Sequence, residues 1–223
     1  MPESLERRLE RLEGARLYFV CEARPGGRDA EAIFRAALEG GADLIQLREK
    51  SLTDEELVAA AARFRALAGR HGALFILNDR PELVEACGAD GAHVGQDDIP
   101  VPEARRLLPA DALLGLSTHS REQIESAHEL GDDSPNYISV GPIWETPTKE
   151  GRPGTGLELI DTAARIARLP WFAIGGIDTE NVGEVVASGA RRIVVVRAIR
   201  DAGHPGAAAR SLREAVDSAV GVG

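Results

Sequence analysis

The sequence predicts an α/β fold: a single (β/α)8 (TIM) barrel with an extra helix at its N-terminus. Short apolar runs alternate with amphipathic segments, several helices close on a glycine just before a strand, and unusual polar residues follow the strands. Strands that alternate with helices form right-handed βαβ units and a parallel sheet. The 223 residues approach the length of one such barrel, about 250 residues. We therefore expect one domain over 1–223, with 1–14 as a helical extension.

The individual elements follow from the spacing of the apolar residues. Predicted strands cover 17–20, 44–47, 74–77, 92–94, 113–116, 137–140, 171–174 and 193–196. Predicted helices cover 29–39, 53–70, 81–87, 101–108, 120–130, 157–168, 179–188 and 206–219. A further helix is expected over 3–12.

Periodicity alone would also allow a doubly wound sheet, and the glycines favour the barrel. The stretches "EGGADLIQL", "CGADGAHV" and "SGARRIVVV" each lead from a glycine directly into a strand. Glycine adopts the left-handed conformation of a helix C-terminus without steric cost. The recurring Gly-Ala step indicates a weak internal βα repeat. Barrels of this kind carry their active sites just after the strands.

Composition restricts the classes of partner. The formal net charge of −10 argues against binding to nucleic acid or to anionic membranes, which a basic surface would favour. No apolar run approaches the roughly 20 residues of a membrane span, and the charged N-terminus is unlike a signal peptide. Cys21 and Cys87 lack metal-ligand or redox spacing. We expect a soluble cytoplasmic protein; the sequence leaves a homo-oligomer open.

The second predicted strand ends in charged side chains. Gln46, Arg48 and Lys50 fall on one face, because strand side chains repeat every two residues. A solvated strand end would explain any one of them. Together they predict an anion site at the barrel mouth, since arginine offers a planar fork and lysine a point charge. Glu49 has the opposite parity and can pair with a helix.

Acidic side chains follow the next two strands. Asn78 and Asp79 come after the third strand, and Asp98 after the fourth. Turn formation and helix capping are the ordinary roles of such residues. Neighbouring strands of a barrel, however, should bring Asp79 and Asp98 together at one rim. Two carboxylates beside an anion site suit Mg²⁺, which prefers oxygen ligands and shares them with phosphates.

The later loops add hydroxyl groups, a lysine and glycines. Ser117 could donate to a phosphate or cap a helix, and we interpret His93 as structural. The loop 141–156 carries Thr146, Thr148 and Lys149 and predicts a lid, with disorder as the alternative. The glycines of "AIGGI" precede a helix, where backbone N–H groups can bind a phosphate. Barrels often bind phosphate at the loops after strands seven and eight.

These patterns place two anion sites on one face, one with enough positive charge for a diphosphate and one suited to a single phosphate. Two phosphorylated substrates that meet over a barrel mouth suggest a transferase from which diphosphate leaves. No residue has the setting of a dedicated nucleophile: neither cysteine follows a strand with a base beside it.

At this point the motifs resemble a known family. "QLREK", "ND" followed by "GQDD", "GLSTHS", "GPIWETPTK" and "AIGGI", in this order and spacing, closely resemble thiamine-phosphate synthase, over about 17–198. The resemblance implies a (β/α)8 barrel that joins hydroxymethylpyrimidine diphosphate to a thiazole phosphate, with release of diphosphate. It also implies a dissociative mechanism, in which diphosphate departs before the thiazole nitrogen attacks.

The resemblance assigns roles residue by residue. The pyrimidine diphosphate would be bound by Gln46, Leu47, Arg48, Glu49, Lys50, Asn78, Ser117 and Lys149. The thiazole phosphate would be bound by Thr146, Pro147, Thr148, Gly176, Val196 and Arg197. One Mg²⁺ would be held by Asp79 and Asp98. Arg197 departs from the family pattern, which commonly has a small hydroxyl residue there.

The sequence leaves three alternative functions open. A thiazole tautomerase of the same superfamily would lack the full diphosphate and metal set. A different phosphate-binding isomerase would need an acid–base pair at opposed strand ends, which the sequence does not show. The third alternative is not an enzyme: a non-catalytic barrel that binds thiamine precursors.

Overall fold

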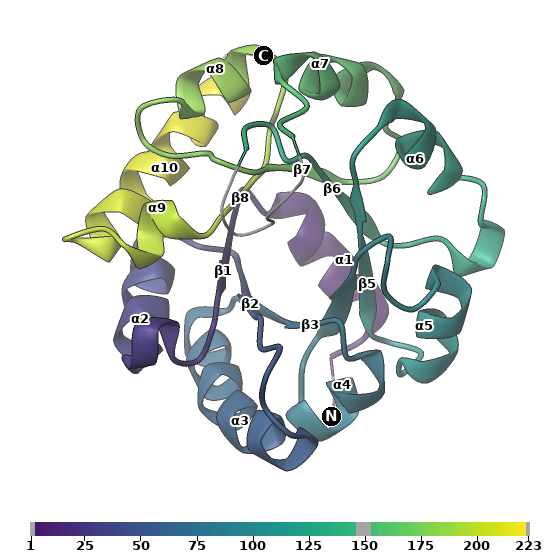
Figure 1. Ribbon diagram of the computed structural model, residues 1–223, viewed down its shortest axis with the longest axis vertical. Helices are drawn as coiled ribbons and strands as arrows, with labels where there is room; N and C mark the ends of the chain where they lie inside the picture. Colours follow the sequence, from purple (N-terminus) through teal and green to yellow (C-terminus); the bar gives the residue numbers. More distant parts are fainter. Residues whose placement is uncertain (1–2, 146–152, 222–223) are drawn as a thin grey trace.

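The chain forms a closed barrel of eight parallel strands surrounded by helices (Figure 1). The computed structural model describes residues 3–145 and 153–221. The strands are β1 (Leu17–Cys21), β2 (Leu44–Leu47), β3 (Leu74–Asn78), β4 (Gly91–Val94), β5 (Leu113–Thr118), β6 (Tyr137–Val140), β7 (Trp171–Ile174) and β8 (Ile193–Val195). Each strand pairs with the next, and β8 closes the barrel on β1. The predicted fold class is confirmed, and every predicted apolar run contains a strand.

Helices follow the strands and form the outer ring, except for α1, which precedes β1. They are α1 (Leu5–Gly14), α2 (Glu31–Glu39), α3 (Asp54–His71), α4 (Val84–Cys87), α5 (Val101–Leu107), α6 (Arg121–Ser126), α7 (Leu157–Ile166), α8 (Val182–Ala187), α9 (Arg197–Arg200) and α10 (Pro205–Val220). Short 3₁₀ turns cover η1 (Pro25–Gly27), η2 (Pro81–Leu83) and η3 (Gly131–Asp133). The prediction of one helix over 81–87 was wrong, because η2 precedes α4. Helix α6 is also shorter than predicted, and α9 was not predicted.

Local sequence signals set the ends of several helices, and α3 shows how. The Thr53 hydroxyl accepts a hydrogen bond from the Glu56 N–H, and the Glu56 side chain accepts one from the Thr53 N–H. This capping box satisfies two backbone donors that a helix start leaves without partners. Gly72, at φ 66°, ends the helix in the left-handed conformation that glycine adopts without strain. The chain then enters β3 two residues later.

Alternate strand residues divide the core into two layers. One set faces the helices, and the other fills the barrel interior; Tyr18, Leu44 and Phe172 belong to the interior set. Helix α1 lies behind the strands in Figure 1, and its Leu12 joins the interior cluster. It therefore covers the N-terminal end of the barrel, opposite the end at which the sequence places the functional residues. Of the helices in the described part of the chain, none is long and apolar enough to cross a membrane.

Candidate active site

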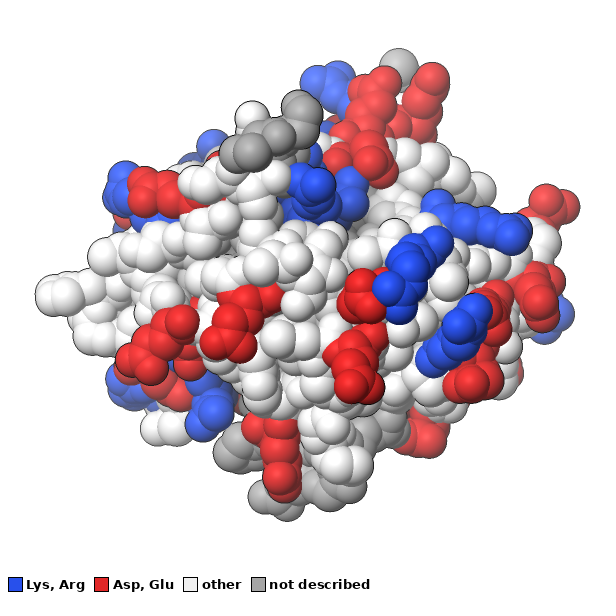
Figure 2. All heavy atoms as spheres, turned by 90° about the horizontal axis from the view of Figure 1, so that it is seen from above, with Lys and Arg blue, Asp and Glu red and all other residues white. Residues whose placement is uncertain are grey.

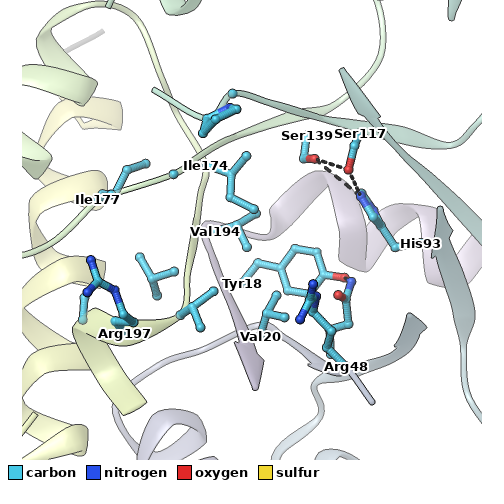
Figure 3. A pocket seen from close by; sticks show the side chains of 18 of the residues that line it. Tyr18, Val20, Arg48, His93, Ser117, Ser139, Ile174, Ile177, Val194 and Arg197 are labelled. Carbon is cyan, nitrogen blue, oxygen red and sulfur yellow. Dashed lines mark hydrogen bonds between the residues drawn. The ribbon is translucent and has the colours of Figure 1, made fainter. Parts of the chain in front are cut away.

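A cavity of about 360 Å³ opens at the C-terminal ends of the strands (Figure 3). All eight strands or the residues directly after them contribute to its wall. The lining residues are Tyr18, Val20, Gln46, Arg48, Asn78, His93, Ser117, Ser139, Gly141, Pro142, Ile174, Gly175, Gly176, Ile177, Asp178, Val194, Val195, Val196, Arg197, Ala198 and Asp201. The cavity thus lies at the end of the barrel that the sequence marks with polar residues.

The row at the end of β2 divides as strand alternation predicts. Gln46 and Arg48 line the cavity, whereas Lys50, predicted on the same face, is exposed and absent from the described lining. Leu47 points the other way and is fully buried between the strands and the helices. Glu49 also leaves the cavity, because its carboxylate accepts a hydrogen bond from the Ala23 N–H at 2.5 Å. The structure therefore does not bring the side chains of Leu47 and Glu49 into the cavity.

The two predicted carboxylates lie side by side. Burial and the adjacent Asp98 carboxyl group, which is hydrogen-bonded to Asp79, raise the pKa of Asp79 to about 6, while the charge of Lys50 acts in the opposite direction. Asp98 is also fixed by the Gly95 N–H, which donates to Asp98 Oδ2 at 2.7 Å. Asp79 has a positive φ of 58°, a conformation that aspartate tolerates better than most residues. Exposed Lys50 is thus part of this charged rim.

Asn78 lies next to this pair and faces the cavity. It is 7% exposed, and its side chain interacts with the Asp79 carboxyl group, whose pKa it lowers. Asn78 therefore joins the carboxylate pair to the cavity wall.

The far wall of the cavity is built from backbone at the ends of β7 and β8. Gly175 and Gly176 have φ angles of 106° and 71°. A Cβ atom on Gly175 would lie 2.5 Å from Pro142 Cα, and one on Gly176 would lie 2.8 Å from Trp144 Cβ. Both glycines are therefore required by the close approach of the segment after β6. The carbonyl oxygens of both glycines accept hydrogen bonds within the protein, from the Trp144 N–H and from Asn181 Nδ2.

Val196 and Arg197 complete this side of the cavity, and Arg197 is exposed there (Figure 3). Thr146, Pro147, Thr148 and Lys149 lie outside the described residues. Their predicted roles stay predictions.

The cavity has both cationic and acidic side chains in its wall. In the described lining, Arg48 and Arg197 are cationic, and Asp178 and Asp201 are acidic. On the face in Figure 2, acidic and basic side chains are interspersed. With a net charge of −10, attraction of an anion must come from these local cations, because exposed charges further away are screened within about 10 Å.

Comparison with known proteins identifies the family. The profile of the thiamine monophosphate synthase family matches residues 17–199. The chain belongs to that family. It is 50% identical over 202 residues to the thiamine-phosphate synthase of Thermus thermophilus, with 89% of this chain and 96% of the relative covered. It is 45% identical over 228 residues to that of an Arthrobacter species, with 93% and 96% covered.

A solved structure agrees with the family assignment. The thiamine phosphate pyrophosphorylase from Pyrococcus furiosus superposes with a TM-score of 0.83 at 28% identity, covering 94% of this chain and 98% of that one. A 3-hexulose-6-phosphate synthase, at 19% identity and a TM-score of 0.64, shows the shared barrel fold alone. The resemblance to this family and the prediction of a transferase of the thiamine-phosphate synthase type are confirmed.

The donor set at the rim of this thiamine monophosphate synthase family member fits a magnesium ion. Asp79 and Asp98 bring two carboxylates together, and a cation between them would relieve the repulsion that raises the Asp79 pKa. Over 3–145 and 153–221, no three His, Cys, Asp or Glu side chains cluster as a metal cage would need. Mg²⁺ needs no such cage, since it commonly takes one or two carboxylates together with substrate phosphates and water.

Among the polar strand residues that line the cavity of this family member, Tyr18, His93 and Ser139 were not predicted as functional. His93, interpreted as structural, lies in the lining, with its Nε2 atom 3.0 Å from Ser117 Oγ (Figure 3). Strand alternation gives two possible faces for His93, one toward the barrel interior and one toward the helices. A strand as short as β4 does not show from its sequence which of the two faces the interior.

Proposed function

We propose that the chain is a thiamine-phosphate synthase. It would couple 4-amino-5-hydroxymethyl-2-methylpyrimidine diphosphate with hydroxyethylthiazole phosphate to give thiamine phosphate and diphosphate. The observation that carries the proposal is the Asp79–Asp98 carboxylate pair, which interacts with Asn78 of the cavity wall and with Lys50, in a member of this family.

The diphosphate would bind on the side of the cavity that Arg48 lines. Arg48 and Lys50 would bind the diphosphate oxygens, together with Lys149 from the loop after β6. Asp79 and Asp98 would hold one Mg²⁺, which when bound would supply positive charge beside the leaving diphosphate.

The pyrimidine ring would lie deeper, against the polar floor. Gln46, Asn78 and Ser117 line this part of the cavity and are 4%, 7% and 5% exposed. Their hydrogen-bonding groups are therefore held in fixed directions, which favours one heterocycle over others.

The thiazole phosphate would bind on the opposite wall. Gly176 and Val196 would offer backbone, and Arg197 would supply a charge. Thr146, Pro147 and Thr148 would complete this subsite. Barrels often bind a phosphate at this place, after strands seven and eight.

The reaction would be a dissociative substitution at the methylene carbon of the pyrimidine. The C–O bond breaks and its electron pair leaves with diphosphate, while the electron-rich amino ring stabilises the methylene cation. The thiazole nitrogen then supplies the electron pair of the new C–N bond. The protein has to orient the partners and stabilise the departing charge, and no protein nucleophile is needed. In keeping with this, Cys21 and Cys87 are absent from the described cavity lining, and burial raises the pKa of both thiols.

Diphosphate release tests the proposal. The purified chain is mixed with both substrates and Mg²⁺, and diphosphate and thiamine phosphate are measured together. We expect equal amounts of the two products, no thiamine phosphate when the thiazole phosphate is omitted, and loss of activity with a chelator. Binding of both substrates without any product would instead support a non-catalytic precursor-binding barrel, and isomerisation of the thiazole alone would support the tautomerase.

A further inference from the structure

A chain of hydrogen bonds crosses the barrel interior beneath the cavity. Gln46 Nε2 donates to Tyr18 Oη at 2.5 Å, and the Tyr18 and Tyr137 hydroxyl oxygens lie 3.2 Å apart. Tyr137 Oη lies 3.2 Å from His93 Nδ1, and His93 Nε2 lies 3.0 Å from Ser117 Oγ. The chain joins side chains of β2, β1, β6, β4 and β5, and its His93–Ser117 end is drawn in Figure 3.

One member of this chain has no place in the site as described so far. Gln46, Tyr18, His93 and Ser117 all line the cavity, whereas Tyr137 is fully buried and is absent from the lining. Its hydroxyl group is nevertheless the link between the two halves of the chain. Nothing in the binding of either substrate requires a hydroxyl group at this depth, so its role must be sought in what it does to its neighbours.

The amide at one end determines the direction of the whole chain. Because Tyr18 Oη accepts from Gln46, its own O–H is left to donate, and the Tyr137 oxygen is the acceptor within reach. Tyr137 accepts there and so donates its O–H to His93 Nδ1. Nδ1 is therefore the unprotonated ring nitrogen of neutral His93, and Nε2–H donates to Ser117 Oγ. Ser139 Oγ lies 3.4 Å from Ser117 Oγ and donates to it as well. With these two donors on its oxygen, Ser117 has its own O–H left for the cavity.

The phenol groups of Tyr18 and Tyr137 stay neutral in the ordinary pH range. Burial raises the pKa of Tyr18. Burial also raises the pKa of Tyr137. Each hydroxyl therefore has one proton to donate and two lone pairs to accept with.

We propose that Tyr137 is a positioning residue, which fixes the hydrogen-bonding order of the cavity floor as an acceptor at Gln46 Oε1 and a donor at the Ser117 hydroxyl, and so selects an aminopyrimidine ring. An amino group supplies the donor that Gln46 Oε1 needs, and a ring nitrogen supplies the acceptor that Ser117 needs. An oxo group in place of the amino group would face the Gln46 oxygen with another acceptor. This inference rests on the proposed function for the identity of the ring, while the direction of the chain is a property of the protein alone.

Packing holds the Tyr137 ring independently of its hydroxyl group. A Cβ atom on Gly115 would lie 2.2 Å from Tyr137 Cζ, so the neighbouring strand fits closely against the ring. Phe172 packs edge-on against Tyr137, with the ring centroids 5.7 Å apart. The variant Tyr137→Phe therefore removes the link of the chain and keeps the ring, whereas Phe172→Leu loosens the same packing and breaks no hydrogen bond.

Steady-state kinetics of the full chain test the role of the hydroxyl group. In Tyr137→Phe we expect the KM for the pyrimidine diphosphate to rise about tenfold, as losing about 1.4 kcal/mol of binding would cause. The KM for the thiazole phosphate should stay within about twofold. The ratio of the affinity for the amino substrate to the affinity for its oxo analogue should fall by a similar factor. Phe172→Leu should change neither the preference nor the ratio of the two KM values. Unchanged kinetics in Tyr137→Phe, an equal rise in both KM values, or the same pattern in Phe172→Leu would each overturn the proposal.

A second measurement, of the His93 tautomer, uses wild-type protein and so does not depend on whether a Tyr137 variant folds. In wild-type protein labelled with ¹⁵N-histidine, the His93 shifts should show protonated Nε2 and unprotonated Nδ1, with the signal assigned by its loss in His93→Gln. Protonated Nδ1 would reverse the direction of the chain and overturn the proposal. Because this experiment uses no substrate, its result is separate from the test of the function: wild-type protein that releases no diphosphate would refute the function, whatever the tautomer.

Discussion

At the scale of single residues, the Asp79–Asp98 pair is the most sharply defined part of the rim. We expect Asp79→Asn and Asp98→Asn each to raise the Mg²⁺ concentration needed for half-maximal activity by at least about tenfold, because Mg²⁺ takes carboxylate oxygens as ligands and one of two would be lost. Titration of the rate of diphosphate release with Mg²⁺ measures this. Asp97→Asn is the matched control: Asp97 adjoins Asp98 in the sequence and is exposed, and its replacement should leave the titration unchanged. A normal titration for Asp79→Asn would remove the metal assignment.

Arg197 carries a second prediction at this scale. It is exposed at the cavity wall, beside the wall built from Gly175 and Gly176. A charged donor to a phosphate contributes about 1.5–3 kcal/mol, so Arg197→Ala should raise the KM for the thiazole phosphate by about tenfold or more. The KM for the pyrimidine diphosphate should not change. Arg35→Ala, on the outer face of α2 with Glu31 as its ion-pair partner, provides the control for loss of one positive charge. An unaltered thiazole phosphate KM would mean that Arg197 points away from the ligand.

At the scale of elements, β5 and β6 fit together through a missing side chain. A Cβ atom on Gly115 would lie 2.2 Å from Tyr137 Cζ and 2.4 Å from His93 Nδ1, and neither ring has room to move in the barrel interior. We expect Gly115→Ala to lower the free energy of unfolding by about 1–3 kcal/mol or more, the usual cost of overpacking a core. Chemical denaturation measures it. The control is Gly183→Ala on the exposed face of α8, where a Cβ atom meets nothing within 4 Å. The stability of this variant should be equal or slightly higher, because alanine favours a helix. Equal stability of the Gly115 variant would show that the strands can separate to admit a methyl group.

The same elements show how far the sequence alone leads. Local patterns predicted the strands, the glycine boundaries and the direction of Gln46 and Arg48, because each depends on neighbours a few residues away. The meeting of Asp79 and Asp98 was predicted as well, since it needs only the rule that consecutive strands of a barrel are adjacent. Tyr137 could not be found in this way. Its role depends on contacts with Tyr18 and His93, 119 and 44 residues away, and on the exact register of three strands.

At the scale of the whole molecule, the barrel has a functional end and a structural end. The cavity opens at the C-terminal ends of the strands, while α1 covers the opposite end through an interior cluster that includes Leu12. Two ends on one rigid barrel allow stability and activity to be changed separately, which gives the molecule-scale prediction a clear readout.

Arg8 of α1 provides that test. Its side chain is 8% exposed and forms an ion pair with Asp90, whose side chain is 3% exposed, at 3.3 Å. It also donates to the Asp111 carbonyl oxygen at 2.6 Å. Removing one partner of a buried ion pair leaves the other charge unpaired, which costs about 3–5 kcal/mol. Arg8→Ala should lose stability on that scale.

The matched control for Arg8 is Arg7→Ala, one position along the same helix. The Arg7 side chain is 75% exposed and pairs with Glu3 at 3.5 Å, so its loss should cost less than about 1 kcal/mol. Both variants should keep wild-type KM values at a temperature where they are folded, because the cavity lies at the other end of the barrel. Denaturation curves and kinetics on the same samples measure the two effects. Equal stability of the two variants would show that Asp90 finds another partner, whereas altered KM values in folded Arg8→Ala would show that the two ends of the barrel are coupled.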